Sequence, residues 1–171
     1  MTLIFISFFT TLLITLKNDK IAEILTLYDN PDNNRKTHKN KVALTGGIII
    51  FANILIIIIY LSLNFDDLKT FSVFESKKDF IIFSFSTILF FLIGFFDDKY
   101  NISANFKFLI MLGILIPTVL LSDNLIIQEV QFSFSDKILK LPFHIAVFWT
   151  ALCFLLFLNA LNMFDGINYQ V

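Results

Sequence analysis

The sequence predicts an all-α fold, a polytopic bundle of transmembrane helices. Hydrophobic residues make up 57% of the 171 residues, charged residues only 16%, and the mean hydropathy is +0.79. An ordinary soluble domain carries about 25% charged residues. Hydrocarbon offers no partner to backbone N–H and C=O groups, so the apolar stretches must satisfy these groups within helices. We therefore interpret residues 1–171 as a single integral membrane domain.

Five apolar stretches are predicted to span the bilayer. They cover residues 2–16, 42–63, 80–96, 106–122 and 142–161. The first is short for a hydrocarbon core of roughly 30 Å at about 1.5 Å per residue. It has no basic start and no small-residue cleavage site before Lys17, so we interpret it as a retained span and not a signal peptide.

Two smaller elements are predicted between the spans. Ile21, Ile24, Leu25 and Tyr28 recur at helical spacing, which indicates a short surface helix that ends before Pro31. Residues 125–134 alternate apolar and polar side chains, which is typical of a small external β-hairpin.

The basic residues orient the predicted spans. Eight lie in the loops after the first and third spans, and five lie in the opposite loops. The first group is Lys17, Lys20, Arg35, Lys36, Lys39, Lys41, Lys99 and Lys107, and the second is Lys69, Lys77, Lys78, Lys137 and Lys140. Cytoplasmic loops are enriched in Lys and Arg, so the amino terminus is predicted to lie outside. This threading brings three polar clusters to the cytoplasmic face.

The net charge of −1 gives no basic bias toward nucleic acid.

The first cluster is Asp97-Asp98, at the inner end of the third span. Adjacent carboxylates repel each other unless a cation lies near them. Magnesium commonly takes one or two carboxylates and completes its octahedron with water and substrate phosphate. On a continuous helix the two side chains diverge by about 100°, so the prediction includes the case in which only one of the two aspartates contacts the metal ion. The alternative is simple solvation at the membrane boundary.

The second cluster is a stripe of Asn159, Asn162 and Asp165 at the inner end of the last span. Residues three apart lie near one another on a helix surface, and three polar groups on one face seldom point at lipid. A stripe of interhelical hydrogen bonds is the alternative to a ligand site.

The third cluster is Arg35-Lys36-Thr37-His38 in the first loop. Arg35 is the one arginine beside twelve lysines, and a guanidinium group suits bidentate phosphate contacts. Positive-inside charge is the competing interpretation. Gly46-Gly47 follows at the start of the second span and permits close approach of a helix or a ligand, with helix packing as the expected role.

Together these clusters resemble the polyprenyl-phosphate N-acetylhexosamine-1-phosphate transferases, or glycosyltransferase family 4. The resemblance runs through Asp29-x-Pro31-x-x-x-Arg35-Lys36-x-His38 with Gly46-Gly47, then Gly94-Phe95-Phe96-Asp97-Asp98-Lys99 with Lys107, then Asn159-Ala160-x-Asn162-Met163-x-Asp165-Gly166-Ile167. It covers essentially the whole chain, with the motifs in order.

The resemblance implies an enzyme of the bacterial cytoplasmic membrane. Such an enzyme transfers a sugar 1-phosphate from a UDP-sugar, for example UDP-N-acetylhexosamine, to undecaprenyl phosphate and releases UMP, which starts a lipid-linked glycan such as O-antigen, capsule or a cell-wall polymer. It implies Mg²⁺, with Mn²⁺ as a substitute. A homodimer is left open.

The resemblance also implies roles for individual residues. Catalysis and metal binding fall to Asp97, Asp98 and Asp165. Substrate binding falls to Arg35, Lys36, His38, Lys107, Asn159, Asn162 and Asn168.

The sequence departs from the family in three places. Asn168 stands where a second aspartate is common, Ala43 where a proline is common and Met111 where a glutamine is frequent. Family members have about ten spans, so the chain is expected to be an amino-terminal half. The alternatives are a small transporter, a non-catalytic membrane bundle or a truncated inactive relative.

Overall fold

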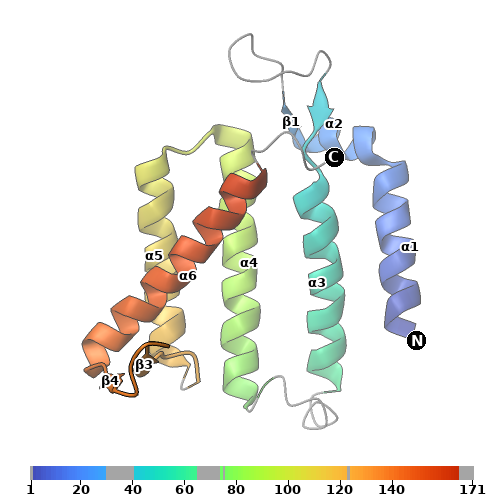
Figure 1. Cartoon of the computed structure of the whole chain (residues 1–171). Coiled ribbons are helices and arrows are strands. Elements are labelled where there is room, and N and C mark those ends of the chain that lie inside the picture. The colour runs from blue at the N-terminus through green and yellow to red at the C-terminus, as the bar shows by residue number, and fades with distance from the viewer. Residues whose placement is uncertain (1, 30–40, 65–73, 75, 123, 166–171) are drawn as a thin grey trace. The chain divides into compact units, whose positions relative to one another are not determined.

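The computed structural model describes residues 2–29, 41–64, 74, 76–122 and 124–165, and helices dominate this part of the chain (Figure 1). The helices are α1 (Thr2–Leu16), α2 (Asn18–Leu25), α3 (Gly46–Leu63), α4 (Lys77–Tyr100), α5 (Ala104–Leu121) and α6 (Phe143–Asp165). The strands are β1 (Tyr28–Asp29), β2 (Val42–Ala43), β3 (Glu129–Gln131) and β4 (Ile138–Lys140).

The helices confirm the predicted fold class. Within the described residues, α3, α4, α5 and the first 18 residues of α6 are long and apolar enough to cross a membrane. The apolar helix α1 is shorter, as its sequence predicted. Each predicted span coincides with one of these helices, so the chain is a multi-pass membrane protein. Its orientation stays a prediction.

The chain forms two compact units, and α4 contributes to both. The first unit comprises residues 1–73 and 91–102, and the second comprises residues 74–90 and 103–171. The prediction of a single membrane domain for residues 1–171 stays a prediction.

In the first unit, α1 packs along α3, and a hydrogen bond between polar side chains links these two largely apolar helices. The Asn53 side-chain nitrogen donates hydrogen bonds to the Thr11 hydroxyl and the Ile49 carbonyl, both at 2.9 Å. A polar group buried between helices needs such partners, because leaving it without them costs free energy. Asn53 therefore fixes the register of α1 against α3.

The connection from α2 to α3 differs from the predicted surface helix. Helix α2 ends at Leu25, because Thr26 adopts a left-handed conformation with φ of 57°. Tyr28 belongs to β1 and not to the helix, and β1 pairs with β2 in antiparallel register. The predicted surface helix is therefore present as α2, but it ends at Leu25 and does not reach Tyr28. Tyr28 is drawn into a strand by its pairing with Ala43, a residue far away in the sequence, and helical periodicity carries no information about such a pairing.

In the second unit, α5 packs against α6, and polar side chains connect α4 to α5. Ser76 caps the start of α4: the Asp79 N–H donates to the Ser76 hydroxyl at 3.1 Å, and that hydroxyl donates to the Asp79 carboxylate at 2.7 Å. The same carboxylate accepts a hydrogen bond from the Ser122 hydroxyl at 2.8 Å. The start of α4 is thereby joined to the end of α5.

The predicted hairpin is present, but its strands begin later than residue 125. Strands β3 and β4 pair in antiparallel register, with Val130 opposite Leu139. The preceding segment is held instead by α6, because the Ile127 N–H donates to the Thr150 hydroxyl at 2.9 Å.

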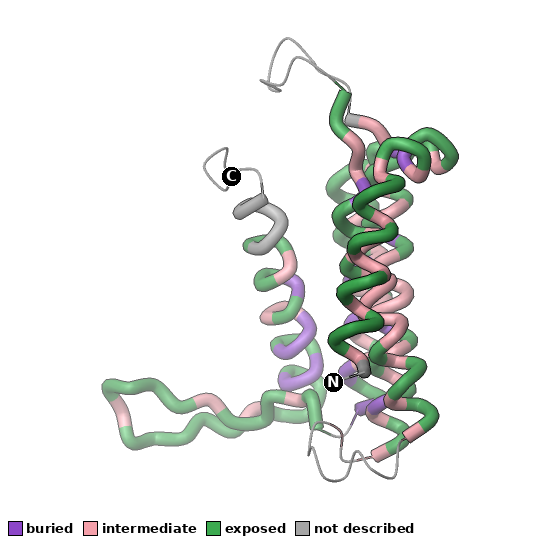
Figure 2. The backbone as a smooth tube through the Cα atoms, turned by 90° about the vertical axis from the view of Figure 1, so that its right-hand side faces the viewer, coloured by how far each residue is buried: buried purple, intermediate pink, exposed green. Residues whose placement is uncertain are grey.

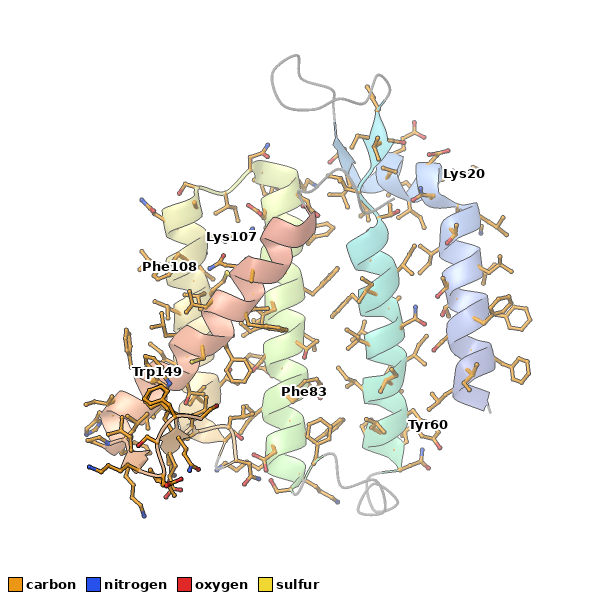
Figure 3. All side chains as sticks on the ribbon, in the orientation of Figure 1. Lys20, Tyr60, Phe83, Lys107, Phe108 and Trp149 are labelled. Carbon is orange, nitrogen blue, oxygen red and sulfur yellow. The ribbon has the colours of Figure 1, made fainter. Side chains whose placement is uncertain are left out.

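Much of the apolar surface of the helices is exposed, as expected for surfaces that face lipid (Figure 2). Helix α3 has no buried residue. Large side chains such as Phe108 and Trp149 project away from the ribbon (Figure 3). Apolar patches of this extent are not stable in water.

Candidate active site

Asp97 and Asp98 lie in the last turn of α4, which continues to Tyr100. The helix ends at Asn101, whose N–H donates to the Asp97 carbonyl at 2.8 Å and whose φ of 50° is left-handed. Because the helix continues through both aspartates, their side chains diverge by about 100° as predicted. The carboxyl end of a helix carries partial negative charge, so two carboxylates there favour a nearby cation.

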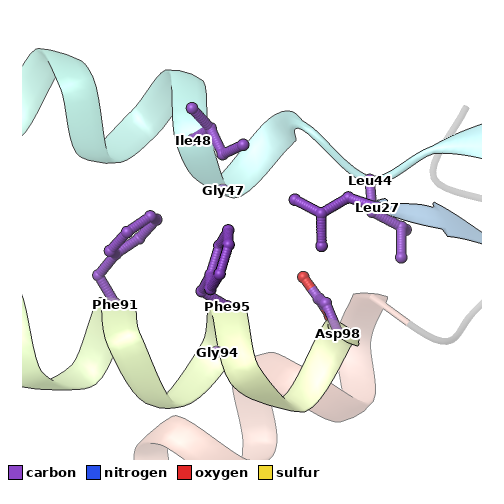
Figure 4. Close-up of a pocket in the computed structure, with 8 residues that line it drawn as sticks. All are labelled: Leu27, Leu44, Gly47, Ile48, Phe91, Gly94, Phe95 and Asp98. Carbon is purple, nitrogen blue, oxygen red and sulfur yellow. The ribbon is translucent and has the colours of Figure 1, made fainter. Parts of the chain in front are cut away.

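Asp98 borders a pocket of about 210 Å³ within the first unit (Figure 4). Apolar side chains form most of the wall: Leu27, Leu44, Ile48, Phe91 and Phe95. Asp98 is exposed, lies at one end of the pocket, and points toward Leu27 and Leu44. A carboxylate beside an apolar space suits an amphiphile that carries a polar head next to a hydrocarbon group.

Two glycines, Gly47 of α3 and Gly94 of α4, also line the pocket. A Cβ atom built at either residue would meet no heavy atom within 4 Å. Neither glycine therefore lies in close contact with a neighbouring helix, and the same holds for Gly46. The expected helix-packing role of Gly46-Gly47 is wrong for the described part of the chain. The absence of side chains at Gly47 and Gly94 leaves open space beside the pocket. Next to the pocket, the Phe51 and Phe91 rings stack at a centroid distance of 3.7 Å and join α3 to this part of α4.

The amino-terminal turn of α3 contributes Gly47 and Ile48 to the same wall. The first N–H groups of a helix have no intrahelical partner and carry partial positive charge. The Thr45 side chain does not cap them, because its hydroxyl donates to the Asn18 side-chain oxygen. The pocket therefore has a carboxylate from α4 and the positive end of α3 on its border, which suits a phosphate that shares a cation with Asp98.

The β1–β2 pair places the ends of the basic loop beside this pocket. Tyr28 lies opposite Ala43, and the Leu44 N–H donates to the Leu27 carbonyl at 3.0 Å. Both leucines belong to the pocket wall. The cluster of Arg35, Lys36 and His38 lies outside the described residues, as does Asn168.

The remaining predicted residues belong to the second unit. Helix α6 continues to Asp165, so Asn159, Asn162 and Asp165 share one helix as predicted. Asn159 is exposed, and the side chains of the other two lie outside the described part. Lys107 lies in the first turn of α5, where its N–H donates to the Ser103 carbonyl at 3.0 Å.

The convergence of Asp97, Asp98 and Asp165 on one metal ion stays a prediction. Among the described residues, no group of three or more His, Cys, Asp or Glu side chains could hold a metal by itself. Magnesium rarely uses such a cage, because it keeps several waters and binds one or two carboxylates together with substrate phosphate. Asp98 at the mouth of the pocket fits that mode of binding.

The pocket-lining leucines and phenylalanines were missed by reasoning from sequence. In a chain so rich in leucine and phenylalanine these residues carry no distinguishing signal. Only the pairing of β1 with β2 and the continuation of α4 bring them together with Asp98.

Helices long and apolar enough to cross a bilayer define the chain as a multi-pass membrane protein, and Asp98 borders an apolar pocket at the end of one of them. The family model described as glycosyl transferase family 4 matches residues 80–170, which is more than half of the chain. The chain belongs to this family.

One curated relative is a probable undecaprenyl-phosphate N-acetylglucosaminyl 1-phosphate transferase of Bacillus subtilis (strain 168). It is 28% identical over 163 residues, which cover 95% of this chain and 41% of the relative. The chain thus spans about two-fifths of the length of this relative. No solved structure matches the chain.

Proposed function

We propose that this chain forms the amino-terminal part of a magnesium-dependent sugar-1-phosphate transferase of the bacterial cytoplasmic membrane. The reaction moves N-acetylhexosamine 1-phosphate from a UDP-sugar to undecaprenyl phosphate. The observation that carries the proposal is the position of Asp98 at one end of an apolar pocket, at the end of a membrane-spanning helix. Family membership and the probable function of the Bacillus subtilis relative support it.

The pocket suits the acceptor lipid better than the nucleotide sugar. Its wall is apolar apart from Asp98, so it accommodates the isoprenoid carbons next to the lipid phosphate. These carbons leave the bilayer and not water, so van der Waals contacts, at about 0.1–0.2 kcal/mol for each atom pair, hold them in the pocket. The phosphate then lies at the Asp98 end, near the first turn of α3.

The reaction is a phosphoryl transfer. An oxygen of the lipid phosphate attacks the β-phosphorus of the UDP-sugar, the bond from that phosphorus to the bridging oxygen breaks, and UMP departs with this oxygen. The product is a lipid diphosphate that carries the sugar. Like charges must approach in this step, and bound Mg²⁺ would neutralise charge on the phosphates.

Named residues of this chain have defined tasks in the proposal. Asp98 would hold the ion together with the lipid phosphate, and Asp97 and Asp165 would supply further carboxylates to it. Arg35, Lys36 and His38, from the segment between β1 and β2, bind phosphate oxygens, with Lys107 as a further cation. Asn159, Asn162 and Asn168 line the nucleotide side, where Asn168 can donate or accept a hydrogen bond but cannot act as a base.

The test compares Asp98→Asn with Asp136→Asn, a control in the loop of the β3–β4 hairpin. Radiolabelled sugar phosphate transfer from UDP-N-acetylhexosamine into lipid is measured in membranes from cells that express the gene containing this sequence. Asp98→Asn should lower transfer by at least about 100-fold, because loss of one transition-state charge contact costs roughly 3 kcal/mol. Asp136→Asn should leave transfer unchanged.

Full activity of Asp98→Asn would overturn the proposal. Ion movement across vesicles that does not depend on any UDP-sugar would favour the transporter alternative instead. Electron paramagnetic resonance then measures Mn²⁺ binding to the reconstituted chain. It shows whether Asp98→Asn has lost the metal ion or has kept the ion and lost only the transfer step.

A further inference from the structure

The β3–β4 hairpin has two chemically different faces. Side chains alternate between the faces of a strand, and paired residues share a face. Val130 is opposite Leu139 on one face. On the other face Glu129 is opposite Lys140, and their charged groups form an ion pair at 3.3 Å. Gln131 is opposite Ile138 on this second face, so Ile138 is its one apolar member within the two strands.

The apolar face continues into the loop between the strands. Phe132 follows Val130 by two residues and thus lies on the same side. The Phe134 ring stacks on the Phe132 ring at 5.3 Å, and the Ser135 N–H donates to the Phe132 carbonyl at 3.0 Å to close the turn. Phe134 is 87% exposed, and Phe132 and Leu139 are about half exposed. The hairpin therefore presents an uncovered cluster of large apolar side chains.

The base of the hairpin lies where two spans end. Helix α5 ends at Leu121 and α6 begins at Phe143. The Leu141 N–H donates to the Gln128 carbonyl at 2.8 Å, which closes the base two residues before α6. Figure 2 shows the hairpin extending sideways from this end of α6, across the direction of the helix.

We propose that the hairpin lies on the membrane surface, with Phe132, Phe134 and Leu139 in the boundary between lipid headgroups and acyl chains. The apolar face would then continue the exposed apolar surface of the first turns of α6, where Phe143 and Ile145 are each more than half exposed. Aromatic side chains favour this level of a bilayer. The Glu129–Lys140 face stays in water. The partner is the bilayer itself, and this inference does not depend on the transferase reaction.

The experiment places a tryptophan on each face of the hairpin. Trp149 is the single tryptophan of the chain and is first replaced in a Trp149→Phe background. Phe134→Trp then reports the apolar face, and Gln131→Trp is the matched control in β3 on the polar face. Both proteins are reconstituted into nanodiscs of phosphatidylcholine with or without brominated acyl chains, and circular dichroism checks that their helix content is equal.

The proposal predicts a blue-shifted emission for Phe134→Trp and loss of its intensity in brominated lipid, with little quenching by aqueous iodide. Gln131→Trp should show the reverse. Iodide quenching of Phe134→Trp equal to that of Gln131→Trp would overturn the proposal. A blue-shifted Phe134→Trp that brominated lipid does not quench would also overturn it, because the ring would then be covered by protein.

Discussion

Two substitutions at Gly94, which lines the pocket, are expected to affect different properties: alanine the free energy of unfolding, and leucine the binding of the acceptor lipid. Glycine in the interior of a helix lowers stability by roughly 0.5–1 kcal/mol relative to alanine. A Cβ atom at Gly94 meets nothing within 4 Å. We therefore expect Gly94→Ala to raise the free energy of unfolding by roughly 0.5–1 kcal/mol, because the helix gains and no contact is lost.

A larger residue at the same position should obstruct the pocket. Gly94→Leu places an isobutyl group in a space of about 210 Å³ beside Asp98. If it removes roughly ten atom-pair contacts with the acceptor, at about 0.1–0.2 kcal/mol each, binding weakens by about 1–2 kcal/mol. This corresponds to roughly a five- to thirtyfold rise in the apparent KM for undecaprenyl phosphate. The KM for the UDP-sugar should stay unchanged.

Gly113 of α5 provides the matched control. Its Cβ position is equally open, and it does not line the pocket. Gly113→Leu should therefore leave the KM for the lipid unchanged. Unfolding is followed by steric trapping in nanodiscs, and kinetics by labelled transfer in membranes from cells that express the gene. A loss of more than about 1 kcal/mol in Gly94→Ala, or an unchanged lipid KM in Gly94→Leu, would refute the reasoning.

Three further predictions concern stability. Asn53→Leu should lower the free energy of unfolding by about 0.6–1.7 kcal/mol, the range of interhelical hydrogen bonds in membranes, as measured by steric trapping. Asp79→Ala should lower it by roughly 1–2 kcal/mol, because the hydrogen bonds that the Asp79 carboxylate accepts from the Ser76 and Ser122 hydroxyls are lost. Partial burial and the nearby carboxylates of Asp19 and Glu23 raise the pKa of Tyr28 above 10.0. The folded chain therefore holds the phenol proton more tightly than the unfolded chain, and the free energy of unfolding should fall as the pH rises above 10.0. Tyr28→Phe should reduce that fall when unfolding is measured as a function of pH.

Each of these has a result that contradicts it. An Asn53→Leu protein as stable as the parent would mean that the hydrogen bonds do not hold α1 against α3. For Asp79, the control is Ser84→Ala, whose hydroxyl bonds only to the Phe80 carbonyl of its own helix. Equal losses of unfolding free energy in Asp79→Ala and Ser84→Ala would show that the hydrogen bond from Ser122 to Asp79 does not stabilise the contact of α4 with α5. Equal alkaline loss in the parent and Tyr28→Phe would remove the role of the phenol.

Most of the fold followed from composition and hydropathy, because a bilayer leaves few alternatives. Once backbone groups must be satisfied within a segment, an apolar run of about 18 residues becomes a helix, and the observed helices coincide with the predicted spans. The exact ends were less predictable. Helix α4 extends to Tyr100, four residues past the predicted end, because charged side chains at a helix end are solvated without breaking it.

The candidate site was predictable only in part. Asp97 and Asp98 stand out because adjacent carboxylates are rare beside a membrane span. Leu27 and Leu44 do not stand out, since seventeen residues separate them and only the β1–β2 pair brings them together. The conformation of Thr26, which ends α2, was also unexpected, because threonine seldom adopts positive φ.

The antiparallel pair of β1 and β2 closes the segment between the strands at its base. The two ends of this segment are fixed to each other and to the wall beside Asp98, so its length can change without moving a helix. Closing a loop of twice the length costs only about 0.6 kcal/mol more. Insertions between the two strands therefore leave the membrane-spanning helices and the pocket wall in place.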